Sequence, residues 1–262
     1  MAFLLVFTTF ATTIFESMKI LVCISKVPDT TAKIAFSTPN TYDENGVTFI
    51  INPYDEWYAL VRALELKETL GGTVTVVSVG GADYEPIIRK ALAIGADDGV
   101  RIDAPESDAF AVAREIAEYA KSQSYDILLC GKETIQYNGG VVPGMIAEML
   151  QLPYVFGASK LDVSGTSVVL EREIATGIEV FHATLPIVIS AAKGLAEQRI
   201  PNMRGIMAAR TKPLNVIASC NAQAKTHVAK FDIPPAKSGC KMIAPEDAAQ
   251  LIQLLHEEAK VI

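Results

Sequence analysis

The residues with the clearest chemical signal lie between positions 124 and 148. Ile127–Cys130 is typical of a buried strand, Gly131–Gly140 of a polar loop that contains glycines, and the residues after it of a helix start. A parallel strand that ends in such a loop brings backbone N–H groups and the positive end of a helix dipole together. The segment therefore predicts a pocket for an anion and indicates nucleotide binding. An ordinary strand-to-helix loop is the alternative.

Composition limits the function classes that the chain can have. Half of its 262 residues are hydrophobic, enough for one large α/β core. Thirty acidic against 23 basic residues give a net charge of −7, which argues against a nucleic-acid partner because phosphate backbones attract an excess of Lys and Arg. The four cysteines form no CxxC pair, and Cys23 and Cys130 lie in apolar runs. We expect buried thiols in a reducing compartment, the cytoplasm, and no metal site.

Apolar, β-branched runs alternate with helix-period segments through most of the chain. This pattern predicts a doubly wound, mostly parallel sheet of Rossmann-like type, covered by helices on both faces. Asp55 is expected to cap the first long helix, which should end at Gly71-Gly72. The expected strands are Ile20–Ile24, Thr73–Val79, Gly99–Ile102, Ile127–Cys130 and Ile187–Ser190, and the expected helices are Glu56–Thr69, Glu85–Ala93, Ala109–Ser122 and Gly144–Leu150.

The pattern changes beyond position 159. Strand-like segments at Lys160–Val163, Ser167–Glu173 and Glu179–Thr184 predict a small antiparallel extension of the sheet. Ala192–Arg210 mixes basic residues with methionines at poor periodicity, and we expect an exposed loop or a short helix there. The polar tail should end in an amphipathic helix over Glu246–Lys260. A lone helix after so long a connection indicates an arm that binds a partner.

These patterns divide the chain into three parts. Residues 1–17 are apolar, but no Lys or Arg precedes Lys19, and the run is too short and Thr-rich for a membrane span. We expect translation to start at Met18, with the leader an upstream extension of the reading frame; a cleaved export signal is the alternative. Residues 18–217 should form the nucleotide-binding domain and residues 218–262 the C-terminal arm, with no stable membrane insertion.

Several stretches together resemble the beta subunit of electron-transferring flavoproteins (ETF), in the same order from Met18 to the C-terminus. Three departures from that family are visible: Ala175–Gly177 replaces an acidic Asp-Gly-Gly turn, Gln136–Gly140 replaces a loop that usually carries an Asp, and Met203 stands where many members have a Leu. The matching stretches are Lys19–Asp29, Ile51–Glu56, Ala63–Glu68, Arg89–Asp97, Gly131-Lys132 with Ile135, Glu171–Ile174, Gly177, Glu179, Leu185-Pro186, Arg199 with Ile206–Arg210, Lys212-Pro213 and Pro234-Pro235.

The resemblance implies a heterodimer with an ETF alpha subunit that holds most of an FAD, while the beta subunit binds AMP. In electron-bifurcating relatives a second FAD replaces the AMP, and the sequence leaves both open. The implied role is to carry electrons from acyl-CoA-type dehydrogenases to a quinone reductase, through transient complexes and without substrate turnover of its own. A universal-stress-like adenine-nucleotide-binding module is the alternative. A ligase or hydrolase is disfavoured because Ser25–Asp29 lacks glycine.

The implied nucleotide site joins two turns at one edge of the sheet. Amides and hydroxyls of the loop after position 130 can hold a phosphate without a cationic side chain, because the helix that opens near Val141 supplies the field. The turn at 52–55 would frame adenosine, although a plain helix start explains it too, and Lys132 can be a solvated loop charge. The expected contacts are Cys23, Asn52, Pro53, Tyr54, Asp55, Val79, Gly131, Lys132, Glu133, Thr134, Ile135, Gln136, Tyr137, Asn138, Gly139, Gly140, Val141 and Val142.

The implied partner-recognition loop spans residues 191–213. A flexible Met on a small-residue loop can enter an apolar pocket while flanking Arg residues steer acidic partners. Brief electron-transfer complexes favour a small anchor of this kind over a broad rigid interface. We expect Met203 to be the anchor and Arg199, Arg204 and Arg210 to form its rim, with Ile206 and Met207 beside it.

Overall fold

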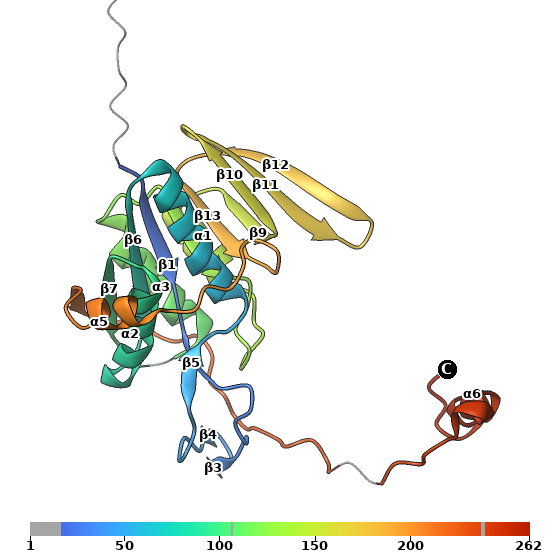
Figure 1. Ribbon diagram of the computed structural model, residues 1–262. Coiled ribbons are helices and arrows are strands. Elements are labelled where there is room, and N and C mark those ends of the chain that lie inside the picture. Colours follow the sequence, from blue (N-terminus) through green and yellow to red (C-terminus); the bar gives the residue numbers. More distant parts are fainter. Residues whose placement is uncertain (1–16, 106, 237–238) are drawn as a thin grey trace, which may run out of the picture.

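The computed structural model describes residues 17–105, 107–236 and 239–262. Its centre is a seven-stranded sheet in the order β14-β7-β6-β1-β8-β13-β9, in which each neighbouring pair runs parallel (Figure 1). The predicted fold class is confirmed. The strands are β1 (Lys19–Cys23), β6 (Thr73–Val79), β7 (Asp98–Asp103), β8 (Ile127–Gly131), β9 (Tyr154–Ala158), β13 (Ile187–Ala191) and β14 (Leu214–Ala218).

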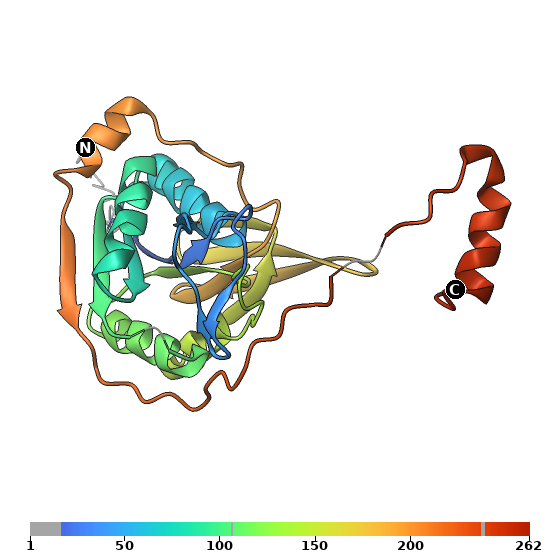
Figure 2. The same ribbon diagram turned by 90° about the horizontal axis from the view of Figure 1, so that it is seen from below.

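Helices cover both faces of this sheet. In β1, Ile20 and Val22 pack with α1 (Asp55–Leu70) and α2 (Glu85–Ile94), while Leu21 and Cys23 pack with α3 (Ala109–Lys121) and α4 (Val142–Leu150). Successive side chains of a strand point to opposite faces, so a strand buried on both sides must be apolar throughout. Figure 2 shows the two helical layers with the sheet between them.

The strand order reverses between β1 and β8. From β1 the chain moves outward through β6 and β7, and then crosses to β8 on the other side of β1. Ligands of open α/β sheets bind outside the carboxyl ends of the strands at such a reversal. The residues that follow β1 and β8 therefore stand at the preferred place for a ligand.

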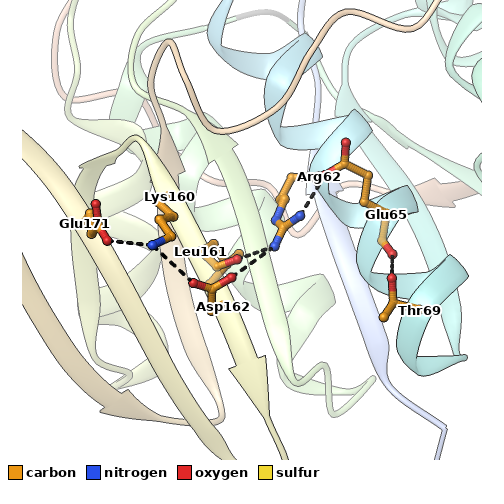
Figure 3. A network of polar contacts seen from close by, with 7 residues as sticks. All are labelled: Arg62, Glu65, Thr69, Lys160, Leu161, Asp162 and Glu171. Atoms are coloured by element: carbon orange, nitrogen blue, oxygen red, sulfur yellow. Dashed lines mark hydrogen bonds and ion pairs between the residues drawn. The ribbon is translucent and has the colours of Figure 1, made fainter.

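Three small antiparallel sheets accompany the central one. The predicted extension forms from β10 (Lys160–Ser164), β11 (Ser167–Ile174) and β12 (Gly177–Thr184), and its hairpin projects beyond the body (Figure 2). Figure 3 shows how Arg62 of α1 ties this extension to the body: it donates to the Leu161 carbonyl, and it lies 3.8 Å from Asp162 and 2.7 Å from Glu65. An excursion after β1 pairs β2 (Lys26–Pro28) with β5 (Phe49–Ile51) and β3 (Phe36–Thr38) with β4 (Thr41–Tyr42).

Some predicted boundaries are wrong. Asp55 does not cap α1: the helix begins at Asp55, and Tyr54 before it makes no side-chain cap bond. The expected helix Glu246–Lys260 is a short 3₁₀ turn (Pro245–Asp247) followed by α6 (Ala248–Glu257). Strand β14 was not predicted, because Asn215 interrupts its short apolar sequence, LNVIA, at a mostly exposed edge position. The predicted leader spans residues 1–17, of which residues 1–16 lie outside the described residues.

The first part of the tail lies on the body of the protein. Glu115 of α3 accepts hydrogen bonds from the Ser219 hydroxyl (2.6 Å) and the Cys220 N–H (2.8 Å). Further along, Phe231 stacks on Phe36 with ring centroids 4.8 Å apart. The tail thus contacts the body at Ser219, Cys220 and Phe231, whereas α6 stands away from it (Figure 2). In the described part of the chain, no helix is both long and apolar enough to cross a membrane.

Candidate functional site

The structure brings the two predicted turns together at the strand reversal. The side chain of Asn52 is 1% exposed; its Nδ2 donates to the Glu133 carbonyl at 2.8 Å, and its Oδ1 accepts from the Ile135 N–H at 3.3 Å. Asp55 accepts from the Glu133 N–H at 3.3 Å. Both side chains therefore hold the loop after β8 in shape, and they satisfy amides of Glu133 and Ile135 that would otherwise be free for a ligand.

The far end of this loop is shaped by left-handed residues. Asn138 has φ 49° and Gly140 has φ 63°, and the Asn138 N–H donates to the Thr134 carbonyl at 2.8 Å. α4 then begins after Val141, whose side chain makes no cap bond. The first N–H groups of a helix lack intrahelical acceptors, and the helix dipole makes this end attractive to anions. The end of the loop that the helix dipole makes attractive to an anion is thus residues 139–142.

Glu56 is a buried acid next to this loop that the sequence indicated only as a first-turn residue of the helix. It is 6% exposed and accepts from the Ser25 N–H at 2.7 Å and the Ser25 hydroxyl at 2.5 Å. Burial raises the pKa of Glu56 from 4.5 to about 7, although the Ser25 bonds oppose the shift. Burial also raises the pKa of Asp55, against the opposing charge of Lys132. Two neighbouring carboxyls here therefore lose some of their preference for the charged form.

Close packing of α1 against β8 depends on Gly131. A Cβ at this position would lie 2.7 Å from Cγ of Glu56 and 3.1 Å from its backbone N. Real Cβ atoms do not approach that closely, so only glycine lets the start of α1 lie over the end of β8. This contact sets the distance between the two turns of the site.

The remaining predicted site residues are spread around the same edge. Cys23 and Val79 are buried near the ends of the paired strands β1 and β6. The neighbouring thiol of Cys130 and burial together raise the pKa of Cys23 well above its ordinary value. Tyr54 and Tyr137 are exposed, and Lys132 lies 3.3 Å from Glu133. Within the described residues, no group of three or more His, Cys, Asp or Glu could hold a metal ion.

Two observations bear on whether a polar ligand fits this edge. The buried Oε1 of Gln136 has no hydrogen-bond partner within the described residues, while its Nε2 lies 3.5 Å from the Lys26 carbonyl. The uncapped start of α4 follows in the same loop and points its remaining N–H groups out of the helix, although Pro143 in its first turn has none to donate. The edge thus presents both an unsatisfied acceptor and a donor group, as a site for a nucleotide requires.

The predicted recognition loop forms a second surface, which we call the docking segment (residues 198–212). It contains α5 (Met203–Ala209), so the alternative of a short helix is correct. Met203 is 73% exposed, and Ile206 and Met207 are exposed beside it. Among the large apolar side chains of this segment, Ile200 is the most exposed, at 84%. Sequence reasoning missed Ile200, whose signal was a large apolar residue between Arg199 and a proline.

Both ends of the docking segment are attached to the body. At the first end, Gln198 donates to the Pro53 carbonyl at 3.0 Å, and Arg199 pairs with Glu68 at 2.6 Å. At the second end, Arg89 of α2 donates to the carbonyls of Ala209 (2.8 Å) and Lys212 (2.7 Å). The expected mobility of the whole loop therefore does not extend to its ends. Because Glu68 engages Arg199, the exposed charges of the expected rim are those of Arg204 and Arg210.

A hollow of about 360 Å³ separates the docking segment from the end of α2. Its lining includes Gly95, Arg199 and Arg204. Gly205 also lines it, and an added Cβ at this glycine would lie 2.3 Å from the Ala93 carbonyl oxygen. α5 thus contacts α2 backbone to backbone, and this contact holds the exposed methionines in place.

Comparison with known proteins gives consistent matches. Residues 40–222 match the family described as Electron transfer flavoprotein domain. Electron transfer flavoprotein subunit beta of Bacillus subtilis (strain 168) is 37% identical over 259 residues, covering 94% of this chain and 100% of that protein. The subunit beta of Sus scrofa is 32% identical over 256 residues, covering 93% and 99%. Acryloyl-CoA reductase electron transfer subunit gamma of Anaerotignum propionicum is 33% identical over 207 residues, covering 76% and 77%.

Proposed function

The chain belongs to the electron transfer flavoprotein family as a beta subunit, with a role in electron transfer, and from this premise we propose that its sheet edge binds AMP while the chain helps an alpha subunit hold FAD. FAD supplies the electron-accepting and electron-donating chemistry when bound. The residues of this chain bind the nucleotide, fix the loop around it and present a surface to electron donors. The chain makes and breaks no substrate bonds in this proposal.

One observation carries the AMP proposal: the uncapped start of α4 lies at the reversal of strand order. The N–H groups of Glu133, Ile135 and Asn138 are bound within the protein, so we propose residues 139–142 as the phosphate site. Asn52 and Asp55 then act by holding the loop, and the ends of β1 and β6 supply apolar surface for adenosine. A second FAD at this edge, as in a bifurcating subunit, is the competing occupant.

We propose that the docking segment receives electron donors of the acyl-CoA dehydrogenase type. The name of one relative, an acryloyl-CoA reductase electron transfer subunit, supports a partner that acts on CoA esters. Met203 is the proposed anchor, with Ile206 and Met207 beside it and the charges of Arg204 and Arg210 around it. A quinone reductase is the proposed electron acceptor. Residues 218–262, whose helix α6 stands away from the body, are proposed to contact the alpha subunit.

The test is co-expression of this chain with its alpha subunit. We expect a yellow heterodimer with flavin absorbance that bleaches when an acyl-CoA dehydrogenase and its substrate are added. A control with dehydrogenase but no substrate should keep its colour. A colourless, self-associated protein would instead support the alternative of a universal-stress-like nucleotide-binding module.

A further inference from the structure

The start of α1 holds two separate segments of the chain at once. On one side, Asn52 and Asp55 bind the loop after β8. On the other side, the Pro53 carbonyl and the Trp57 indole bind the first residues of the docking segment. We propose that Trp57 is a positioning residue for partner docking, which fixes the backbone at Arg199 so that Ile200 and Met203 are presented at a set place. The inference rests on the proposed docking function.

The geometry of Trp57 supports this role. Its side chain is 8% exposed within the core cluster that α1 shares with α2. The indole Nε1 donates to the Arg199 carbonyl at 3.2 Å, and the ammonium of Lys90 lies 5.2 Å from the ring centroid. A buried indole N–H needs an acceptor, and here the acceptor is the peptide that leads directly into Ile200. The rigid core is thereby joined to the most exposed apolar side chain of the docking segment.

Further bonds hold the same stretch in line along α1. Gln198 binds the Pro53 carbonyl before Trp57, and Arg199 pairs with Glu68 in the last part of the helix. The far end is held by α2 through Arg89. A segment clamped at both ends loses less conformational entropy when its exposed side chains enter a partner. Loosening the first clamp should therefore weaken docking without changing the chemistry that follows.

The experiment compares Trp57→Phe with Tyr58→Phe in the intact heterodimer. Trp57→Phe removes the indole N–H and keeps an aromatic ring, whereas Tyr58→Phe makes a similar change at the next residue, whose hydroxyl has no bond to the docking segment. We expect Trp57→Phe to raise the KM for reduction by an acyl-CoA dehydrogenase about three- to tenfold, the value of one hydrogen bond, at unchanged kcat and flavin content. Tyr58→Phe should leave all three unchanged.

Hydrogen exchange gives a readout that does not depend on a dehydrogenase. Amides of residues 198–212 should exchange faster in Trp57→Phe, and those of residues 131–142 should not. Gln198→Leu, a substitution on the surface, should speed exchange of the same amides by a smaller amount. This variant replaces Trp57→Phe as the test if Trp57→Phe fails to fold. Unchanged exchange at 198–212, or faster exchange throughout with loss of flavin, would overturn the proposal. If the wild-type heterodimer is not reduced by the dehydrogenase, the proposed docking function is wrong. Hydrogen exchange still tests, in that case, whether Trp57 holds the backbone at Arg199.

Discussion

The proposed nucleotide site at the edge of the sheet and the docking segment flank the same helix start but are built in opposite ways. At the edge, the buried side chains of Asn52 and Asp55 hold the loop after β8 from within, and buried Glu56 holds Ser25 after β1. In the docking segment, apolar side chains such as Ile200 and Met203 face solvent, and polar bonds fix only the ends. Buried polar groups suit a ligand that stays, because they hold the loop in one conformation, while exposed apolar side chains suit a partner that leaves.

The largest effect should follow loss of the Asn52 side chain. Asn52→Ala leaves the Glu133 carbonyl and the Ile135 N–H without their partner, at a cost of about 1–3 kcal/mol for each group that stays buried. We expect the free energy of unfolding of the heterodimer to fall by about 2–4 kcal/mol and AMP to be lost. Urea unfolding and nucleotide extraction measure both. Asn45→Ala, at an exposed turn, is the control. An equal loss of stability and of AMP in that variant would show that Asn52 has no special role.

A pH series tests the buried acid at the edge. The folded-state pKa of Glu56 is raised from 4.5 to about 7. The contribution of protonated Glu56 to the free energy of unfolding is therefore fully present below pH 4.5 and is lost as pH rises through about 7. Stability should fall by up to about 3 kcal/mol over this range. The side chain introduced by Glu56→Gln cannot ionise, so the stability of this variant should depend less on pH. The smaller pH dependence that remains should come from Asp55. Equal slopes in wild type and variant would show that Glu56 is charged throughout.

The packing of α1 on β8 can be tested with a pair of glycines. Gly131→Ala places a methyl group 2.7 Å from Cγ of Glu56, and the overpacking should cost about 1–3 kcal/mol. Gly139→Ala is the matched control, because no atom lies within 4 Å of its added Cβ, and its stability should change by less than about 0.5 kcal/mol. Thermal unfolding of both heterodimers measures the difference. Similar melting temperatures would mean that the approach of α1 is not tight.

The smallest effects should come from the docking segment, because its side chains are not part of the core. Met203→Ala and Ile200→Ala should each lower kcat/KM for reduction by the dehydrogenase about three- to tenfold, through lost apolar contact with the partner. Stability and flavin content should not change. Met242→Ala removes a similarly exposed methionine from the C-terminal tail and serves as the control. If only Ile200→Ala slows reduction, the anchor is Ile200 and not Met203.

The parts of the fold that sequence predicts are those with local patterns. Continuous apolar runs identified β1, β6 and β8 because strands buried on both faces have little room for polar residues. The meeting of the turns at 52–55 and 131–142 followed from the same reasoning, since parallel strands end at one edge. Edge strand β14 was not predicted, because it is short and mostly exposed.

The missed features depend on contacts between residues far apart in the chain. Glu115 binds the tail more than 100 positions later, and Trp57 binds the Arg199 carbonyl 142 positions away. Neither residue carries a local signal, because an acid in a helix and a tryptophan in a core are both common. Glu56 is close to Asn52 and Pro53 in the sequence, but it is buried because α1 packs closely against Gly131 of β8.

Nucleotide counting tests the central claim most directly. Extraction of the purified heterodimer, followed by chromatographic quantification, should give one AMP and one FAD per heterodimer in wild type, and FAD without AMP in Asn52→Ala. Two FAD and no AMP would assign the edge to a second flavin. Wild-type heterodimer with no adenine nucleotide beyond a single FAD would contradict the proposal that the loop at 131–142 binds a phosphate.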